Sequence, residues 1–173
     1  MISVEEALQI VLNSVQDFGT EEISLTESLG RVLKEDIKAD RDFPPFNRVS
    51  MDGIAIDVKQ FEQGQRVFKT EGIQAAGSKR KTLKNAEKCV EIMTGAVLTK
   101  NTNAVIPYER VIIDKGIAFI QAEEVKEGQN IHRKGRDKRK GAILIPKNTI
   151  VSAAEIGVLA TVGKTTVLVA KHP

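Results

Sequence analysis

The sequence predicts a mainly β protein with a few helices, that is, an α+β fold. Beyond residue 50 the chain is a series of short apolar runs separated by Gly, Asn and Lys clusters, which is typical of short strands joined by turns. Apolar residues recur at helical spacing chiefly near the two ends of the chain. Its 173 residues suffice for one ordinary domain or two small ones.

The N-terminal segment predicts an amphipathic helix. Ser3 can cap it, Glu6 stands three residues later as the capping-box partner, and Gly19 favours an end. Apolar residues recur at helical spacing between them: Ala7, Leu8, Val11, Leu12 and Val15. Two further helices are expected, over residues 26–33 with Thr26 as cap and from Ser152 to Gly163.

The strands are expected mainly in the middle of the chain. Extended structure begins at Ile37, and the two adjacent prolines after Phe43 predict an ordered loop over residues 42–46. The last two central runs form a hairpin that turns on residues 114–116. The predicted strands are Gly53–Val58, Cys89–Met93, Ala104–Ile106, Val111–Ile113, Ile117–Ile120, Ala142–Ile145 and Thr165–Ala170.

Composition excludes several classes of protein. The net charge of +3, from 26 Lys+Arg and 23 Asp+Glu, is too small to favour nucleic acid or a membrane surface as the main partner. Only 4% of residues are aromatic, so base-stacking platforms are nearly excluded. Cys89 is the only cysteine and is expected in the core, which rules out an internal disulfide and favours the cytoplasm. The apolar stretch 149–170 carries charges and glycines, so no membrane span is expected.

Two polar segments between the predicted strands are candidates for chemistry. In residues 44–53, Asp52 precedes a glycine, and a carboxylate held there could bind Mg²⁺ or orient water; a simple turn is the alternative. In residues 93–96, Thr94 and Gly95 follow a strand, where backbone N–H groups could approach phosphate or molybdate; a strand-ending turn is the alternative.

A basic run is the third candidate. Residues 132–140 hold six Lys and Arg in nine positions. They could meet the phosphates of a nucleotide or cofactor, with arginines offering two parallel donors, or they could form a solvated loop. No dinucleotide fingerprint, phosphate loop, nucleophile elbow or zinc-protease motif occurs.

Taken in order, these segments resemble the N-terminal half of the molybdopterin molybdotransferases, the MoeA family that includes the gephyrin E domain. Asp42-Phe-Pro-Pro-Phe-Asn-Arg-Val-Ser-Met-Asp-Gly-Ile-Ala is similar to the family's Pro-Pro-Phe-Asp and Met-Asp-Gly-Tyr-Ala. Glu91-Ile-Met-Thr-Gly-Ala and Asn103-Ala-Val-Ile resemble its Ile-Met-Thr-Gly-Ala and Asp-Ala-Val-Val. His132-Arg-Lys-Gly-Arg-Asp and Leu159-Ala-Thr-Val-Gly resemble its Gly-Glu-Asp and Leu-Ala-Ser-x-Gly.

The resemblance implies an enzyme of molybdenum cofactor biosynthesis. It would insert molybdate into adenylylated molybdopterin with Mg²⁺ or a similar divalent cation and release AMP. It would be a homodimer, with a molybdopterin adenylyltransferase as a further possible partner. The implied fold has coiled, bifurcated β-sheets in an elongated arrangement of two subdomains. These are residues 1–40 with 145–173, and an inserted module at 41–144. A pterin-binding domain is expected after residue 173, so this fragment alone is expected to be inactive.

The resemblance also implies roles for particular residues. Asp52 and Thr94 fall on catalytic positions of the cleft, with Asp52 also placing the metal. The implied substrate-binding residues are Ser50, Gly53, Gly95 and Arg133. Carboxylates of the family pattern are replaced here at three positions, by Asn47, Asn103 and Arg136. These changes keep an alternative open, a non-catalytic scaffold or dimerisation module of the same family.

Overall fold

The computed structural model describes residues 2–172 and divides into two compact units. The first unit combines the two ends of the chain, up to residue 40 and from residue 141. The second unit is the continuous segment 41–140. Its end lies four residues before the boundary at 144 that we expected from the sequence.

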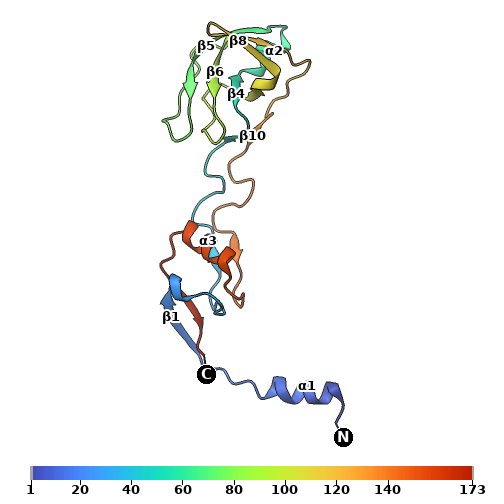
Figure 1. Ribbon diagram of the computed structural model, residues 1–173, viewed down its shortest axis with the longest axis vertical. Coiled ribbons are helices and arrows are strands. Elements are labelled where there is room, and N and C mark those ends of the chain that lie inside the picture. Colours follow the sequence, from blue (N-terminus) through green and yellow to red (C-terminus); the bar gives the residue numbers. More distant parts are fainter. Residues whose placement is uncertain (1, 173) are drawn as a thin grey trace. The chain divides into compact units, whose positions relative to one another are not determined.

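A six-stranded sheet forms the second unit (Figure 1). The strand order is β7-β4-β6-β5-β9-β8, and every neighbouring pair is antiparallel except β5 and β6, which run parallel. The strands are β4 (Gly53–Ile56), β5 (Val67–Gln74), β6 (Lys88–Ile92), β7 (Ala104–Pro107), β8 (Val111–Asp114) and β9 (Ile117–Ile120). Together with the small sheets of the first unit, it confirms the prediction of a mainly β protein with few helices.

The core of this sheet explains its order. All four residues of β4 are buried, which a strand achieves only with neighbours on both edges and cover on both faces. On one face the core gathers Ile54, Phe68, Cys89, Ile106 and Ala118, and the short helix α2 (Val58–Glu62) adds Val58 and Phe61. Cys89 is fully buried, and burial is the main reason that the pKa of its thiol is raised to about 11.

Short elements complete the second unit. Strand β3 (Arg48–Val49) pairs with β10 (Ile131–His132), and an isolated bridge joins Phe43 and Lys138 of the same two segments. A second bridge joins Arg48 to Val97, in the turn that follows β6. The three-residue helix η2 (Tyr108–Arg110) joins β7 to β8. Strand β3 therefore begins two residues after the stretch 42–46 that the prolines led us to expect as a loop.

The first unit is built from two strand pairs and a helix. Strand β1 (Thr20–Ser24) pairs with β12 (Thr166–Ala170), and β2 (Ile37–Lys38) pairs with β11 (Ile143–Ile145). Helix α3 (Ala153–Thr161) begins with the predicted cap, because Ser152 and Glu155 form a capping box. The core of this unit is Leu33, Ile37, Ile145, Val151, Leu159, Val167 and Val169.

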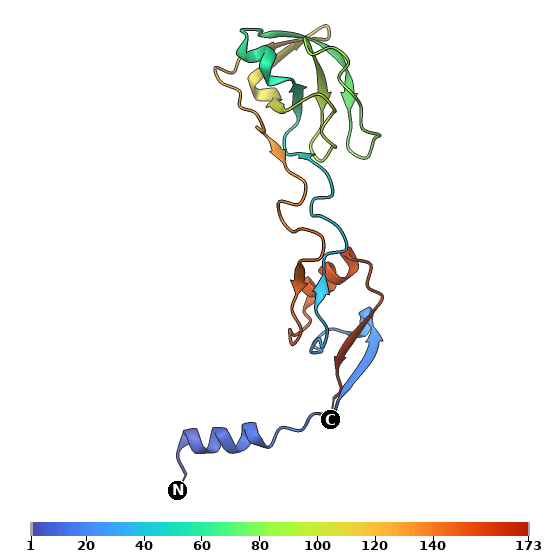
Figure 2. The same ribbon diagram turned by 180° about the vertical axis from the view of Figure 1, so that it is seen from behind.

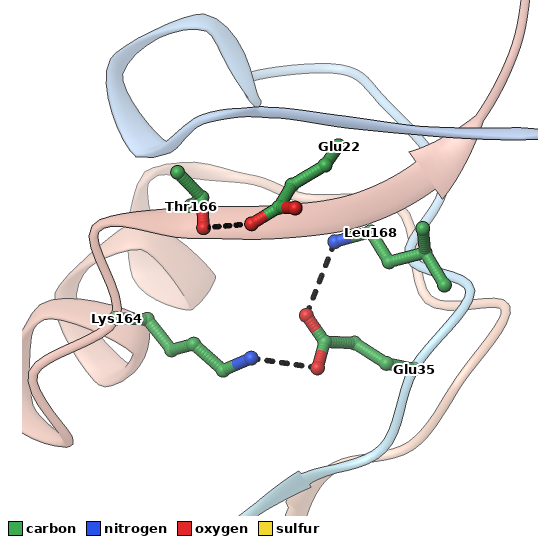
Figure 3. A network of polar contacts seen from close by, with 5 residues as sticks. All are labelled: Glu22, Glu35, Lys164, Thr166 and Leu168. Atoms are coloured by element: carbon green, nitrogen blue, oxygen red, sulfur yellow. Dashed lines mark hydrogen bonds and ion pairs between the residues drawn. The ribbon is translucent and has the colours of Figure 1, made fainter.

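Hydrogen bonds connect β12 and Lys164, just before its start, to the segment that precedes β2 (Figure 3). The Glu35 carboxylate accepts hydrogen bonds from the Lys164 ammonium at 2.6 Å and from the Leu168 N–H at 3.1 Å. The Thr166 hydroxyl also bonds to Glu22 on the neighbouring strand β1. These contacts join residues that lie more than 120 positions apart in the sequence.

The helix expected over residues 26–33 is wrong. Only a three-residue 3-10 helix, η1 (Leu25–Glu27), forms there. Gly30 has a φ of +78°, and the next residues, Val32 and Leu33, bridge to Ile150 and Val169 in the same unit. Tertiary pairing therefore outweighs the local helical spacing. Val58 begins α2 rather than ending a strand, and β1 and β5 were not foreseen.

Helix α1 (Val4–Asn13) has the predicted capping box, since the Ser3 hydroxyl accepts from the Glu6 N–H at 3.1 Å and Glu6 accepts from the Ser3 N–H at 2.8 Å. None of its residues is buried, and its apolar side chains Val4, Leu8, Ile10, Val11 and Leu12 are more than half exposed. The helix therefore presents an unburied apolar side in this chain. Among residues 2–172, no helix is both long enough and apolar enough to cross a membrane.

Candidate functional site

The two residues expected to be catalytic meet at one end of the central strand β4. Asp52 immediately precedes β4, and Thr94 follows β6, its hydrogen-bonded neighbour. Oδ1 of Asp52 accepts a hydrogen bond from the backbone N–H of Thr94, with the two atoms 2.6 Å apart. Both residues are exposed. The structure thus brings together two residues that are 42 positions apart in the sequence.

The Thr94 contact keeps Asp52 charged. Hydrogen bonds from the Thr94 backbone and then from its side chain lower the pKa of the Asp52 carboxyl below its ordinary value, against a weaker opposing effect of burial. The carboxylate is therefore ionised at neutral pH. It is a negative charge at the surface, oriented by the Thr94 N–H.

Gly53 is required by the packing of β4 against β7. A Cβ atom at this position would lie 1.9 Å from the backbone oxygen of Ile106, far inside contact distance. Ile106 lies opposite Ile54, the next residue of β4. The glycine therefore lets the backbone carrying Asp52 approach β7 closely, and its expected role as a substrate contact is not needed to explain it.

The turn at Thr94 does not offer free backbone donors. The N–H of Thr94 donates to Asp52, that of Gly95 donates to the Val49 oxygen at 2.9 Å, and that of Ala96 donates to the Met93 oxygen at 3.0 Å. Gly95 has a φ of +83°, which suits glycine. These backbone groups are therefore not free to bind an oxyanion, which agrees with the alternative of a strand-ending turn.

The other expected substrate-binding residues lie near this turn or in a neighbouring hollow. Ser50 is exposed next to β3, and its N–H donates to the Asn130 oxygen at 3.1 Å. Arg133 lines a surface hollow of about 290 Å³ together with Asn47, Asn103 and Glu127. No hydrogen bond or ion pair found among residues 2–172 joins Arg133 to Asp52 or Thr94.

The two asparagines that replace family carboxylates hold the backbone. Oδ1 of Asn47 accepts from the Lys134 N–H at 2.9 Å, and Oδ1 of Asn103 accepts from the Val58 N–H at 2.8 Å at the start of α2. Each amide keeps the acceptor oxygen that an aspartate would offer, without the charge. Arg136, the third replacement, has an exposed side chain.

Asp52 is the residue that the resemblance implies as a metal ligand. Across residues 2–172 there is no cluster of three or more His, Cys, Asp or Glu side chains that could hold a metal ion. Asp52 is a single carboxylate, whereas Mg²⁺ needs six oxygen ligands and commonly combines one or two carboxylates with water and substrate phosphates. Any divalent cation here needs most of its ligands from outside this chain.

Two residues beside Asp52 were missed by the sequence reasoning. The Tyr108 N–H donates to the Asp52 backbone oxygen at 3.1 Å, and the Tyr108 hydroxyl donates to Oε2 of Glu91 at 3.1 Å. Burial and the Glu91 charge raise the pKa of the phenol to about 12. Glu91 lies in β6, whereas Tyr108 is the first residue of η2, directly after β7, so no local pattern in the sequence reveals their contact.

Comparison with known proteins identifies the family. Residues 2–163 match the family model described as "MoeA N-terminal region (domain I and II)". The chain belongs to the MoeA N-terminal family. This agrees with the resemblance that the three sequence stretches indicated.

Curated relatives of this MoeA N-terminal chain are longer proteins. It is 38% identical over 174 residues to a molybdopterin molybdenumtransferase of Synechocystis, covering all of this chain and 45% of that protein. It is 34% identical over 176 residues to a molybdopterin molybdenumtransferase of Staphylococcus epidermidis, covering 99% of this chain and 42% of that protein. The chain therefore spans less than half the length of these relatives.

Solved structures show the same fold. A crystal structure of a molybdopterin biosynthesis MoeA protein from Pyrococcus horikoshii OT3 superposes with a TM-score of 0.90 and 31% identity, covering this whole chain and 47% of that one. A second structure of the protein from this organism gives a TM-score of 0.79 at 30% identity.

Proposed function

We propose that this chain is the N-terminal region of a molybdopterin molybdenumtransferase, which inserts molybdate into adenylylated molybdopterin and releases AMP. The observation that carries the proposal is the contact between Asp52 and Thr94, the two positions that the family pattern implies for the cleft. The names of the Synechocystis and Staphylococcus relatives support the same reaction. The region would supply dimer contacts and one wall of the active-site cleft.

Each residue of the proposed wall has a physical task. Asp52 is oriented by Thr94, so its carboxylate would present a fixed negative charge to the reacting groups. A divalent cation, Mg²⁺ or a similar ion, would supply positive charge for the oxyanion and phosphate oxygens when bound. The Thr94 hydroxyl bonds to Asp52 in this chain and would exchange that contact for an oxygen of molybdate or phosphate when the substrate is bound. Ser50 would lie beside them, and Arg133 would reach phosphate oxygens from the hollow it lines.

One wall of a cleft does not hold the reacting groups in the geometry that the reaction needs, so this chain alone is expected to be inactive. The missing groups would come from a pterin-binding domain in the remainder of the protein. A molybdopterin adenylyltransferase, possible as a partner, would supply the adenylylated substrate. The cytoplasm is part of the same proposal and accords with a single, buried cysteine.

Helix α1 supports the proposed homodimer. A ten-residue helix is marginal by itself in water, and α1 buries none of its residues in this chain. Covering its apolar side with protein, from a second subunit, would stabilise it. Light scattering of this chain over a concentration series measures its self-association. A monomer at all concentrations would mean that the dimer contacts do not lie in this region.

The direct test is a reaction assay of the intact protein. Purified protein is mixed with adenylylated molybdopterin, Mg²⁺ and molybdate, and AMP release is followed with and without molybdate. Molybdate-dependent release of AMP supports the proposal. Its absence, with a folded protein and an active relative as positive control, overturns it.

A second candidate is a non-catalytic scaffold or dimerisation module of the same family. The observation that favours it is the absence of carboxylates at Asn47, Asn103 and Arg136, since both asparagines bond backbone N–H groups without offering a charge. The same assay separates the two functions. A scaffold would self-associate and release no AMP.

A further inference from the structure

Positive charge is concentrated on two segments of the second unit. Residues 41–49 and 131–140 contain eight of the chain's 26 Lys and Arg and two of its 23 Asp and Glu, a net charge of +6. Since the whole chain carries +3, the remaining 154 residues sum to −3. We call these two segments the basic strip. Its cations are Arg41, Arg48, Arg133, Lys134, Arg136, Lys138, Arg139 and Lys140.

The two segments run side by side, so their charges reinforce one another. Ile131 and His132 pair with Val49 and Arg48, and Phe43 bridges to Lys138. Figures 1 and 2 show the pair from opposite sides, one segment in cyan and the other in orange. All eight cations are exposed.

The acidic residues of the strip neutralise little of this charge. Asp137 pairs with His132 at 2.7 Å, and Asp42 accepts from the Lys140 N–H at 2.9 Å and lies 3.5 Å from the Lys134 ammonium. Six cations of the strip form no ion pair within 4.0 Å among residues 2–172: Arg48, Arg133, Arg136, Lys138, Arg139 and Lys140. Like charges placed side by side repel, so solubility alone would favour spreading them over the surface.

The strip begins at the Asp52–Thr94 site. Val49, next to Arg48, exchanges backbone hydrogen bonds with Gly95 at 2.9 Å and Ala96 at 3.0 Å. Ser50 bonds to Asn130, the residue that precedes β10. The site itself carries the negative charge of the Asp52 carboxylate, which repels an approaching oxyanion.

We propose that the basic strip is an electrostatic collecting surface that draws dianionic oxyanions, phosphate or molybdate groups, to the Asp52–Thr94 site. This inference rests on the proposed function for the identity of the site. A field of one sign around a site raises the local concentration of an oppositely charged substrate and its association rate by tenfold or more at low salt. The effect fades when salt shortens the Debye length from about 10 Å at 0.1 M to about 3 Å at 1 M.

The experiment compares two variants of the intact protein with equal loss of charge. In the strip variant, Lys138→Gln, Arg139→Gln and Lys140→Gln are combined; the strip's hydrogen bonds at Lys138 and Lys140 use backbone N–H groups and are retained. The matched control combines Lys59→Gln, Lys69→Gln and Lys115→Gln, three exposed lysines of the second unit outside the strip. AMP release is measured at low and high salt, with molybdate and the adenylylated pterin varied separately.

The strip variant is expected to lose about fivefold or more in kcat/KM at low salt, mainly through KM, with the difference shrinking at high salt. The control is expected to stay within about twofold of the parent. The substrate whose KM rises identifies the oxyanion that the strip collects. Equal effects in both variants, or a loss that salt does not change, would overturn the proposal, as would strip-dependent binding of duplex DNA tighter than that of either substrate.

A second measurement separates this proposal from the proposed function. Calorimetric titration of the intact parent protein with inorganic pyrophosphate, and separately with molybdate, needs no turnover. Salt-sensitive binding that is lost in the strip variant supports the strip even where the parent releases no AMP. Binding that is unchanged in the strip variant overturns it.

Discussion

Oδ1 of Asp52 lies 2.6 Å from the backbone nitrogen of Thr94. This contact fixes a charged carboxylate at the end of the buried strand β4 and ties it to the turn that follows β6. The backbone of Asp52 is held as well, because the Tyr108 N–H donates to its carbonyl oxygen. Both the side chain and the backbone of Asp52 are therefore held by hydrogen bonds at the end of a central strand.

Gly53→Ala is predicted to destabilise the protein strongly. The new Cβ would sit 1.9 Å from the Ile106 oxygen, so β4 and β7 must move apart. We expect a loss of about 3 kcal/mol or more in the free energy of unfolding, measured by urea denaturation. Gly157→Ala is the control, because a Cβ there meets no atom within 4 Å. Equal stability of the two variants would show that β4 does not approach β7 this closely.

Asn103→Ala is predicted to cost about 1 kcal/mol of stability, because the Val58 N–H at the start of α2 loses its acceptor. Asn103→Asp keeps an acceptor oxygen and is expected to stay within about 0.5 kcal/mol of the parent. Thermal unfolding of the three proteins provides the measurement. An alanine variant as stable as the parent would show that this hydrogen bond contributes nothing.

Tyr108 is the only tyrosine of the 173 residues, so its ionisation can be followed by ultraviolet absorbance of this chain. Burial and the charge of Glu91 raise its pKa to about 12. In Glu91→Gln the neighbouring charge is gone, and the titration midpoint is expected to shift to lower pH. A midpoint at the ordinary value of about 10 in the folded parent would contradict the Tyr108–Glu91 contact.

Glu35 is predicted to make stability depend on pH. Burial alone would raise the pKa of Glu35, but the hydrogen bonds from Lys164 and from the Leu168 N–H outweigh it and lower the pKa below its ordinary value. The folded state therefore binds this proton less readily than the unfolded state. The stabilising contribution of the Glu35 carboxylate is present above the pKa that this group has in the unfolded state. It is lost as the pH falls through the pKa that the group has in the folded state.

Glu35→Gln tests this contribution. The substitution should lower the free energy of unfolding by about 1–2 kcal/mol at pH 7 and by less at pH 3, measured by denaturant unfolding at both pH values. Glu27→Gln, an exposed carboxylate in the same unit, is the control. A cost that is the same at both pH values would show that the Glu35 charge does not stabilise the first unit.

The sequence predicted those parts of the fold that depend on local signals. Both capping boxes, at Ser3 and Ser152, begin helices as expected, because the cap and its partner lie three residues apart. The expected helix at 26–33 failed because Leu33 pairs with Val169, a contact that no local pattern reveals. Strand β5 was not predicted, because buried and exposed residues alternate only partly along it and several of its residues are polar.

Local patterns made Asp52 and Thr94 separate candidates, but only the family resemblance implied that they belong to one site. Asp52 and Thr94 are separated by 42 positions, so spacing alone could not bring them together. Their backbone partners were also beyond prediction: the occupied N–H groups of the turn depend on Val49, and the support of Asp52 depends on Tyr108. Register between strands decides these contacts, and it is set by the whole sheet.

The central claim is that Asp52 and Thr94 line the active-site cleft and act on the reacting groups there. The measurement that tests it most directly is molybdate-dependent AMP release by the intact protein carrying Asp52→Ala or Thr94→Ala, with Asp114→Ala on the edge strand β8 as control. We predict a fall in kcat of about 100-fold or more for both site variants, unchanged circular dichroism, and a control within about twofold of the parent. Turnover at the parent rate in the Asp52 or the Thr94 variant would remove that residue from the site.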